Sequence, residues 1–238
     1  MSRRDAEFDS NRVLQKILSL PYMLVIFATK LMNKLKELIK ANRLFFRVYV
    51  VIALTAIIII LLFSKADGFV FLNPYHNSLF NYISYFFTFL GDGIFCIGLG
   101  VLLLLMKRRV LSLLVISSYI VSGVIAQVLK YFVTEQRPGS FPELSQYKYF
   151  IQDVTLRGSQ ASFPSGHTAS AFALASVLAF TMKDKKKSLF LLLIAIMIGY
   201  SRIYTGNHFL IDVLGGSLIG LLSGILCWLA AIKKTWLV

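Results

Sequence analysis

The sequence predicts an all-α integral membrane protein, a bundle of six transmembrane helices preceded by an amphipathic helix at the membrane surface. Two observations carry this prediction. The chain of 238 residues is 57% hydrophobic and only 15% charged, with a mean hydropathy of +0.73, whereas a typical soluble domain carries about 25% charged residues. Its long apolar segments also alternate with short polar or basic ones, as in proteins that cross a membrane several times.

The N-terminal region, residues 1–45, is expected to be separate from a membrane domain formed by 46–238. Residues 1–16 are polar, and the apolar run 17–28 is too short to cross about 30 Å of hydrocarbon. No small-residue cleavage site follows that run, which disfavours a signal peptide. From 17 to 42 the pattern favours an amphipathic helix on the membrane, although a dimerisation arm would show the same pattern. Its apolar and basic residues are Leu24, Phe27, Leu31, Leu35 and Leu38, and Lys30, Lys34, Lys36 and Lys40.

The six predicted spans are 48–63, 79–106, 110–129, 165–182, 188–204 and 209–232. Polar connections at 64–78 and 131–163 separate some of them. Gly91-Asp92-Gly93 interrupts the second span, and we interpret Asp92 as a structural polar contact or as the point where the helix meets the interface. Small residues recur every fourth position in the fourth and sixth spans, which favours close helix packing. They are Ala171, Ala175 and Ala179, and Gly216, Gly220 and Gly224.

The basic residues predict the orientation. A net charge of +14 is compatible with nucleic-acid binding, but the Lys and Arg residues fall in clusters between apolar runs, which is typical of membrane anchoring, so no nucleic-acid partner is expected. Outside the tail these clusters are 107–109, 183–187 and 233–234, all on one side of a six-span bundle. The positive-inside rule therefore predicts cytoplasmic termini, with the opposite helix ends outside the cytoplasm. Cys96 and Cys227 lie in apolar segments and indicate neither a disulfide nor a thiolate metal site.

The first polar motif is Lys130-x6-Arg137-Pro138, where the third span ends. Two cations on one side of a helix exit suit a dianionic phosphate. Lys and Arg at such an exit also commonly extend toward lipid headgroups, so this motif alone leaves both interpretations open.

The second motif is Pro164-Ser165-Gly166-His167, at the start of the fourth span. A helix N-terminus offers free N–H groups and the positive end of the helix dipole to an anion. His167 would lie at that site and is a candidate acid for protonating a leaving oxygen. A plain helix cap with a surface histidine would have the same local sequence.

The third motif is Ser201-Arg202-x5-His208-x3-Asp212, between the fifth and sixth spans. Ionisable residues at membrane depth are costly, so their presence points to a site. On a helix, residues four apart share a face, so the Asp212 carboxylate can hold the imidazole of His208. Such a pair activates a histidine. Arg202 can grip a phosphate. A structural ion pair is the alternative for this motif alone.

Together the three motifs resemble the signature of the type 2 phosphatidic acid phosphatase superfamily, in the right order and at every fixed position. The resemblance implies that His208 attacks phosphorus to form a phosphohistidine, that Asp212 holds its ring, and that His167 protonates the leaving group. It also implies that the phosphoryl oxygens are bound by Lys130, Arg137, Ser165, Gly166 and Arg202. Members of the family need no metal, and no cofactor is expected here.

The resemblance leaves the substrate open: undecaprenyl pyrophosphate, lipid A phosphate, phosphatidylglycerophosphate and phosphatidate are all handled by relatives. The compact form looks bacterial, which places the protein in the cytoplasmic (inner) membrane with its site on the periplasmic face. Selectivity is expected in 131–163. The alternatives are a lipid phosphotransferase that uses the same residues and an anion or lipid transporter. A transporter would favour charges near mid-span or internal repeats, and the sequence shows neither. The oligomeric state is undetermined.

Overall fold

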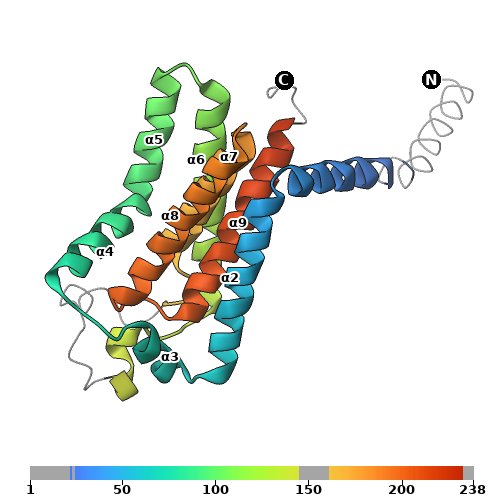
Figure 1. The fold of residues 1–238 in the computed structure, drawn as a ribbon. Coiled ribbons are helices and arrows are strands. Elements are labelled where there is room, and N and C mark those ends of the chain that lie inside the picture. Colours follow the sequence, from blue (N-terminus) through green and yellow to red (C-terminus); the bar gives the residue numbers. More distant parts are fainter. Residues whose placement is uncertain (1–21, 23–24, 145–160, 233–238) are drawn as a thin grey trace, which may run out of the picture. The chain divides into compact units, whose positions relative to one another are not determined.

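The computed structural model describes residues 22, 25–144 and 161–232, and in that part of the chain the regular structure is helical (Figure 1). The chain divides into two units, 1–41 and 42–238. The α-helices of the second unit are α2 (Arg43–Leu62), α3 (Lys65–Leu72), α4 (Ser78–Leu90), α5 (Gly93–Leu105), α6 (Arg109–Phe132), α7 (Gly166–Thr181), α8 (Lys185–Tyr204) and α9 (Leu210–Ile232).

In the first unit, residues 25–41 are helical. Large apolar side chains such as Phe27 and Met32 are exposed there, and lysines share the same helix. The predicted amphipathic helix over 17–42 begins outside the described residues, as does the predicted polar tail over 1–16. The location of this helix on a membrane surface stays a prediction.

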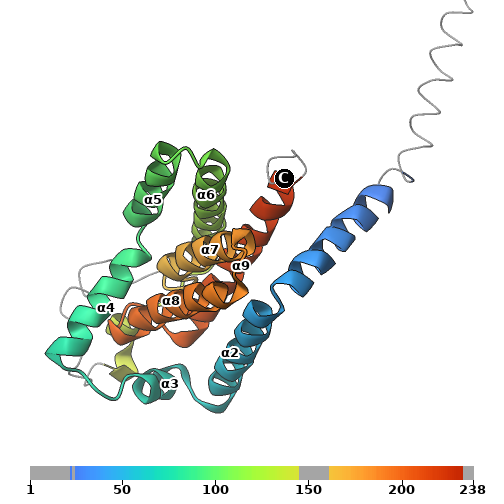
Figure 2. The same cartoon turned by 45° about the horizontal axis from the view of Figure 1, so that its top comes forward.

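Helix α7 is the centre of the second unit. It contacts α6, α8 and α9, and it lies between them in both ribbon views (Figures 1 and 2). Most of its residues are buried, Ala171, Ala175 and Ala179 among them. The short side chains allow neighbouring helices to approach α7 closely, and helices in lipid gain stability mainly from such tight packing.

The glycine stripe on α9 provides the other half of this contact. A Cβ added at Gly216 would lie 2.5 Å from the backbone O of Ser165, and one added at Gly220 would lie 2.4 Å from the backbone O of Ala169. Both distances are shorter than any ordinary contact, so only glycine lets the two backbones approach this closely. The predicted packing role of Gly216 and Gly220 is confirmed. The face of α7 that they meet carries Ser165, Ala169 and Ala173, which the predicted alanine stripe did not include.

Each of the six predicted apolar segments contains helix, but fewer than six of the described helices are long and apolar enough to cross a membrane. Among the described residues four helices qualify as spans, α2, α6, α8 and α9, and a fifth qualifies if α4 and α5 are taken as one bent span. The axis bends by 55° between α4 and α5, at the predicted Gly91-Asp92-Gly93 interruption. Helix α7 has 16 residues, about 24 Å of helix against about 30 Å of hydrocarbon, and so a count of six is not reached.

The two polar connections contain structure that the sequence analysis did not assign. Residues 65–72 form α3, whose first turn is capped by Ser64, since its side chain accepts a hydrogen bond from the Asp67 amide at 3.1 Å. Short 3₁₀ turns occupy Pro138–Ser140 and Pro142–Leu144. The rest of the second connection, 145–160, lies outside the described residues. Both connections belong to the end of the bundle where the three motifs are found.

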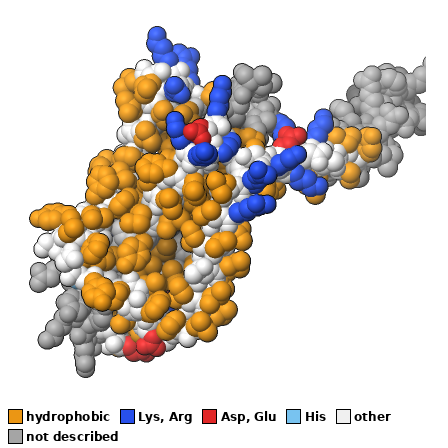
Figure 3. Space-filling model, viewed as in Figure 1, with side chains coloured by type: hydrophobic (Ala, Val, Ile, Leu, Met, Phe, Trp, Pro, Cys, Tyr) orange, Lys and Arg blue, Asp and Glu red, His pale blue; other side chains and the backbone are white. Residues whose placement is uncertain are grey.

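Exposed apolar side chains cover the sides of the helices, and basic side chains gather at one end (Figure 3). In the second unit the basic clusters are at the α5–α6 turn, Lys107–Arg109, and the α7–α8 turn, Lys183–Lys187. An apolar belt with one basic end is the surface expected of a protein that crosses a membrane several times.

Candidate active site

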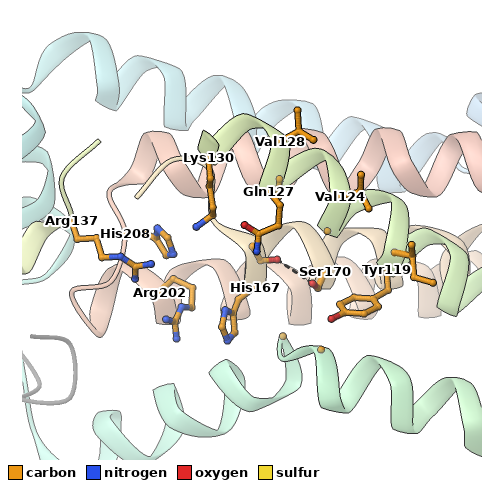
Figure 4. A pocket seen from close by; sticks show the side chains of 16 residues that line it. Tyr119, Val124, Gln127, Val128, Lys130, Arg137, His167, Ser170, Arg202 and His208 are labelled. Atoms are coloured by element: carbon orange, nitrogen blue, oxygen red, sulfur yellow. Dashed lines mark hydrogen bonds between the residues drawn. The ribbon is translucent and has the colours of Figure 1, made fainter. Parts of the chain in front are cut away.

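The three sequence motifs meet in one cavity of about 700 Å³ (Figure 4). From the motifs it is lined by Lys130, Arg137, Gly166, His167, Arg202 and His208. The remaining wall comes mainly from one side of α6, where Ile120, Val124 and Val128 make it apolar. A strongly cationic end and an apolar wall therefore share a single space.

His208 sits in the loop between α8 and α9, and its ring is almost completely buried, with 3% of the side chain exposed. The loop is turned by Gly206, whose φ of 68° lies in the left-handed region. The His208 amide donates to the backbone O of Arg202 at 3.1 Å. Its Nδ1 lies 3.6 Å from Oδ2 of Asp212, which leaves Nε2 as the ring nitrogen free to act toward the cavity.

Asp212 stands in the first turn of α9, behind His208 and away from the cavity lining. Its Oδ2 accepts a hydrogen bond from the Phe209 amide at 2.8 Å, so the carboxylate also satisfies the start of α9, as in one half of a capping box. Because this bond fixes the carboxylate, the orientation of His208 is set by the helix start.

Ser162 completes this group, although the sequence analysis did not include it. Its hydroxyl donates to Oδ2 of Asp212 at 2.5 Å and lies 3.5 Å from Nδ1 of His208. The available signal was its position two residues before Pro164, as a small polar residue next to a motif. Ser162 is therefore a second donor to the same carboxylate oxygen that accepts the Phe209 amide.

Burial lowers the pKa of His208 to about 4, and the hydrogen bond and charge of Asp212 oppose that shift without cancelling it. The positive charges of Arg202 and Arg137 add to the lowering. An ordinary histidine has a pKa near 6.5. His208 is consequently neutral at physiological pH, with a lone pair available on Nε2 for attack on phosphorus.

Hydrogen bonds to neutral oxygens hold the three cations. Arg202 is 5% exposed and donates from Nη1 to the Thr88 hydroxyl at 3.1 Å. Arg137 donates to Oδ1 of Asn207 at 3.3 Å, and Lys130 donates to the backbone O of Ala161 at 3.0 Å. These contacts orient the three side chains that line the cavity. The supporting residues Thr88, Asn207 and Ala161 were not predicted.

The start of α7 brings Gly166 and His167 to the cavity. Ser165 is fully buried, and its hydroxyl oxygen accepts hydrogen bonds from the Thr168 amide at 3.4 Å and the Thr168 hydroxyl at 2.8 Å. The Ser165 amide donates to the backbone O of Asp212 at 3.0 Å. Ser165 is thus the cap of α7 and its link to α9, and it is absent from the cavity lining. Its predicted phosphate contact stays a prediction.

A small aromatic core clamps the loop that carries His208. Phe209 packs edge-on against Phe69 of α3 and Phe141, with ring centroids 6.0 Å and 5.3 Å apart. Ile203 and Leu144 belong to the same buried cluster. Since Phe209 follows His208 directly, this packing ties the two polar connections to the site and fixes the loop between α8 and α9.

The family model that matches this chain is that of the PAP2 superfamily, over residues 111–236. That range is more than half of the chain and contains all three motifs. The chain belongs to the PAP2 superfamily. The resemblance predicted from the motifs is confirmed.

Three known proteins illustrate the relationship. The chain is 28% identical over 110 residues to an undecaprenyl-diphosphatase, BcrC of Bacillus subtilis, covering 44% of this chain and 52% of that protein. It is 33% identical over 105 residues to phosphatidylglycerophosphatase B of the same organism, covering 40% and 46%. The crystal structure of Aquifex aeolicus LpxE superposes with a TM-score of 0.58 at 30% identity, covering 68% of this chain and 93% of that one. The match spans about half the length of the two curated relatives.

Proposed function

We propose that this PAP2 protein is a membrane lipid phosphatase that hydrolyses a phosphomonoester or pyrophosphate of a membrane lipid through a phosphohistidine on His208. The observation that carries the proposal is the composition of the single cavity. It combines three cations, two histidines and an apolar wall on α6, so it suits a molecule with a phosphate at one end and a hydrocarbon chain at the other.

In the first step Nε2 of His208 attacks phosphorus, and the bond from phosphorus to the leaving oxygen breaks. His167 gives its proton to that oxygen, so the leaving group departs as an alcohol or as a protonated lipid phosphate. Asp212 stabilises the positive charge that grows on the His208 ring. Lys130, Arg137 and Arg202 bind the phosphoryl oxygens together with Ser165 and the Gly166 amide, the set that the family resemblance implies.

In the second step a water molecule attacks the phosphohistidine. His167, now neutral, takes the proton of that water, the phosphorus–nitrogen bond breaks, and inorganic phosphate leaves. His208 and His167 return to their starting protonation states. Neither step needs a metal or a cofactor, and metal independence is part of the proposal.

The relatives support a lipid substrate without fixing which one. Undecaprenyl pyrophosphate and phosphatidylglycerophosphate are named by the two curated relatives. Lipid A phosphate and phosphatidate remain candidates from the family resemblance. Phosphate release from these four lipids in detergent micelles, by purified wild-type protein and by His208→Ala, tests the proposal. Activity of the wild type on at least one lipid, absent in His208→Ala, is expected, and equal rates for the two proteins would contradict it.

A lipid phosphotransferase is the second candidate, because the same phosphohistidine can be attacked by a lipid or sugar hydroxyl in place of water. Adding increasing acceptor alcohol to the phosphate-release assay separates the two. A hydrolase keeps releasing phosphate, whereas a transferase diverts the phosphoryl group to the acceptor. An anion or lipid transporter is disfavoured by the same cavity, since its ionisable groups gather at one end of the helices.

The apolar helices and the family place the chain in a membrane as a multi-pass protein. We further propose the bacterial cytoplasmic (inner) membrane, cytoplasmic termini and a site on the periplasmic face. The support is the location of the basic turns Lys107–Arg109 and Lys183–Lys187 at the end of the bundle away from the motifs.

A further inference from the structure

We infer that Asp92 is a positioning residue for His167, so that the site contains a second His–Asp pair beside His208 and Asp212. Oδ2 of Asp92 lies 3.6 Å from Nε2 of His167. Asp92 belongs to none of the three motifs and lies 75 positions before His167 in the sequence. The inference rests on the proposed function, because it assigns Asp92 to the proton transfer that His167 performs there.

The Asp92 carboxylate has two tasks, one for each oxygen. Asp92 is the N-cap residue of α5, and its Oδ1 accepts a hydrogen bond from the Ile94 amide at 2.8 Å. With Oδ1 fixed by the helix, Oδ2 is held toward His167. The distance of 3.6 Å is that of an ion pair, longer than a direct hydrogen bond. Catalytic contacts commonly shorten when the substrate is in place.

The bend between α4 and α5 places Asp92 beside the start of α7. A Cβ added at Gly91 would lie 3.1 Å from the backbone O of His167 and 2.6 Å from Cγ2 of Ile198. A Cβ added at Gly93 would lie 2.1 Å from the Tyr119 hydroxyl. Glycine on both sides of Asp92 therefore lets the bend press against the start of α7 and against α6.

The charges around His167 explain what an acid contributes here. The cavity brings Arg202 from α8, Lys130 from α6, and Arg137 and His208 from the loops that follow these helices. Three of these groups are cations, which disfavour a protonated imidazole. Asp92 is the carboxylate facing His167 from the α4–α5 bend, and its negative charge favours the protonated form that must be ready before the leaving oxygen departs.

The proton balance assigns no transfer to Asp92. Asp92 attracts the N–H at Nε2 of His167 and leaves Nδ1 for the leaving oxygen. One proton passes from His167 to that oxygen as its bond to phosphorus breaks, and one returns from the hydrolytic water. Asp92 stays a carboxylate throughout, and its effect is confined to orientation and charge.

The alternative is that Asp92 only caps α5, and the chain offers a matched control for it. Asp184 is the N-cap residue of α8, and its Oδ1 accepts a hydrogen bond from the Lys186 amide at 3.0 Å. It thus makes the same kind of cap at a turn that does not line the cavity. Asn caps a helix about as well as Asp. Asp92→Asn and Asp184→Asn therefore remove one charge each and keep the cap.

The experiment measures both variants on two substrates, dioctanoyl phosphatidate, whose leaving alkoxide needs a proton, and p-nitrophenyl phosphate, whose leaving group does not. For Asp92→Asn we expect phosphatidate turnover to fall about ten-fold. This is less than the full effect of a general acid, because the His167 and Asp92 side chains are 22% and 41% exposed and solvent screens their interaction. Turnover of p-nitrophenyl phosphate should stay within about two-fold. The high-pH limb of the phosphatidate rate profile should move to lower pH, and Asp184→Asn should match the wild type in every measurement.

Two results would overturn the inference. If Asp92→Asn behaves as Asp184→Asn on both substrates, Asp92 is a helix cap and nothing more. If it loses the same factor on both substrates with an unshifted pH profile, its role is structural. A wild-type protein inactive on every phosphate tested would instead remove the proposed function, and this inference with it.

Discussion

The pair of His208 and Asp212 gives the sharpest prediction, and the perturbation to make is Asp212→Asn. Asn has nearly the same shape, so it can still accept the Phe209 amide that Asp212 accepts at 2.8 Å. It has lost the negative charge that faces Nδ1 of His208 at 3.6 Å. Its NH₂ group would also favour the tautomer with the proton on Nε2, which removes the lone pair needed for attack.

The magnitude follows from the distance. Two unit charges 3.6 Å apart interact by about 4 to 5 kcal/mol at an effective dielectric constant of about 20. The His208 ring gains only part of its charge in the transition state, so about 2 to 4 kcal/mol of stabilisation is lost. This corresponds to a rate about 30 to 10³ times lower.

Ser162→Ala should cost less, because Asp212 keeps its charge and its bond from Phe209. Losing one hydrogen bond to a charged group is worth about 1.5 to 3 kcal/mol at most, and we expect about a ten-fold lower rate since the carboxylate stays in place. His208→Ala should abolish turnover, because it removes the attacking nitrogen.

The assay is phosphate release from a lipid that the wild type hydrolyses, combined with trapping of the phosphoenzyme in alkaline quench, where phosphohistidine survives. The order of rates should be wild type, Ser162→Ala, Asp212→Asn and His208→Ala, with trapped phosphate absent only from the last. Thermal unfolding in detergent checks that each variant is folded. A folded Asp212→Asn within ten-fold of the wild type would refute the orienting role of Asp212.

Three further predictions concern protonation, metal and orientation. With a pKa of about 4, His208 stays neutral as the pH falls through 6.5, where an ordinary histidine gains its proton, and it becomes protonated and unable to attack only near pH 4. The protonation of the three histidines can be followed by ¹⁵N NMR, with the signals assigned by single substitutions. A His208 titration near pH 6.5 would contradict the prediction. Activity should be the same in excess chelator, whereas a loss that magnesium restores would show metal dependence. Orientation can be tested with single cysteines in a background without Cys96 and Cys227. A cysteine at the exposed Glu143 should react with an impermeant maleimide in intact cells, and one at the exposed Lys186 should not. The reverse result would place the site on the cytoplasmic side.

The helices and the three motifs could be predicted from the sequence because both depend on local sequence patterns. Apolar runs predict helices whatever their partners are, and the fixed spacing of His208 and Asp212 places them on one helix face or at its start. The 16 residues of α7 illustrate the limit. Its composition is that of a membrane span, but α6, α8 and α9 surround it. This burial depends on the tertiary structure and cannot be predicted from the sequence of the segment alone.

The supporting residues of the site were missed for the same reason. Ser162, Thr88 and Asn207 are ordinary polar residues in sequence, and each acquires its role only from the partner that the fold brings within hydrogen-bond distance. Helix α3 is different, since Ser64 followed by Asp67 is a recognisable helix start. The polarity of the connection as a whole conceals this helix start.

The two His–Asp pairs differ in burial, and this difference matches the two tasks of the proposed cycle. His208 and Asp212 are 3% and 2% exposed, so desolvation keeps the attacking ring neutral and excludes water from competing for Nδ1. His167 and Asp92 are 22% and 41% exposed, so the ring that gives and regains a proton in every turnover stays in contact with water. An acid buried as deeply as His208 would be held in its neutral form by desolvation. A nucleophile as exposed as His167 would lose the orientation that Asp212 and Ser162 give His208.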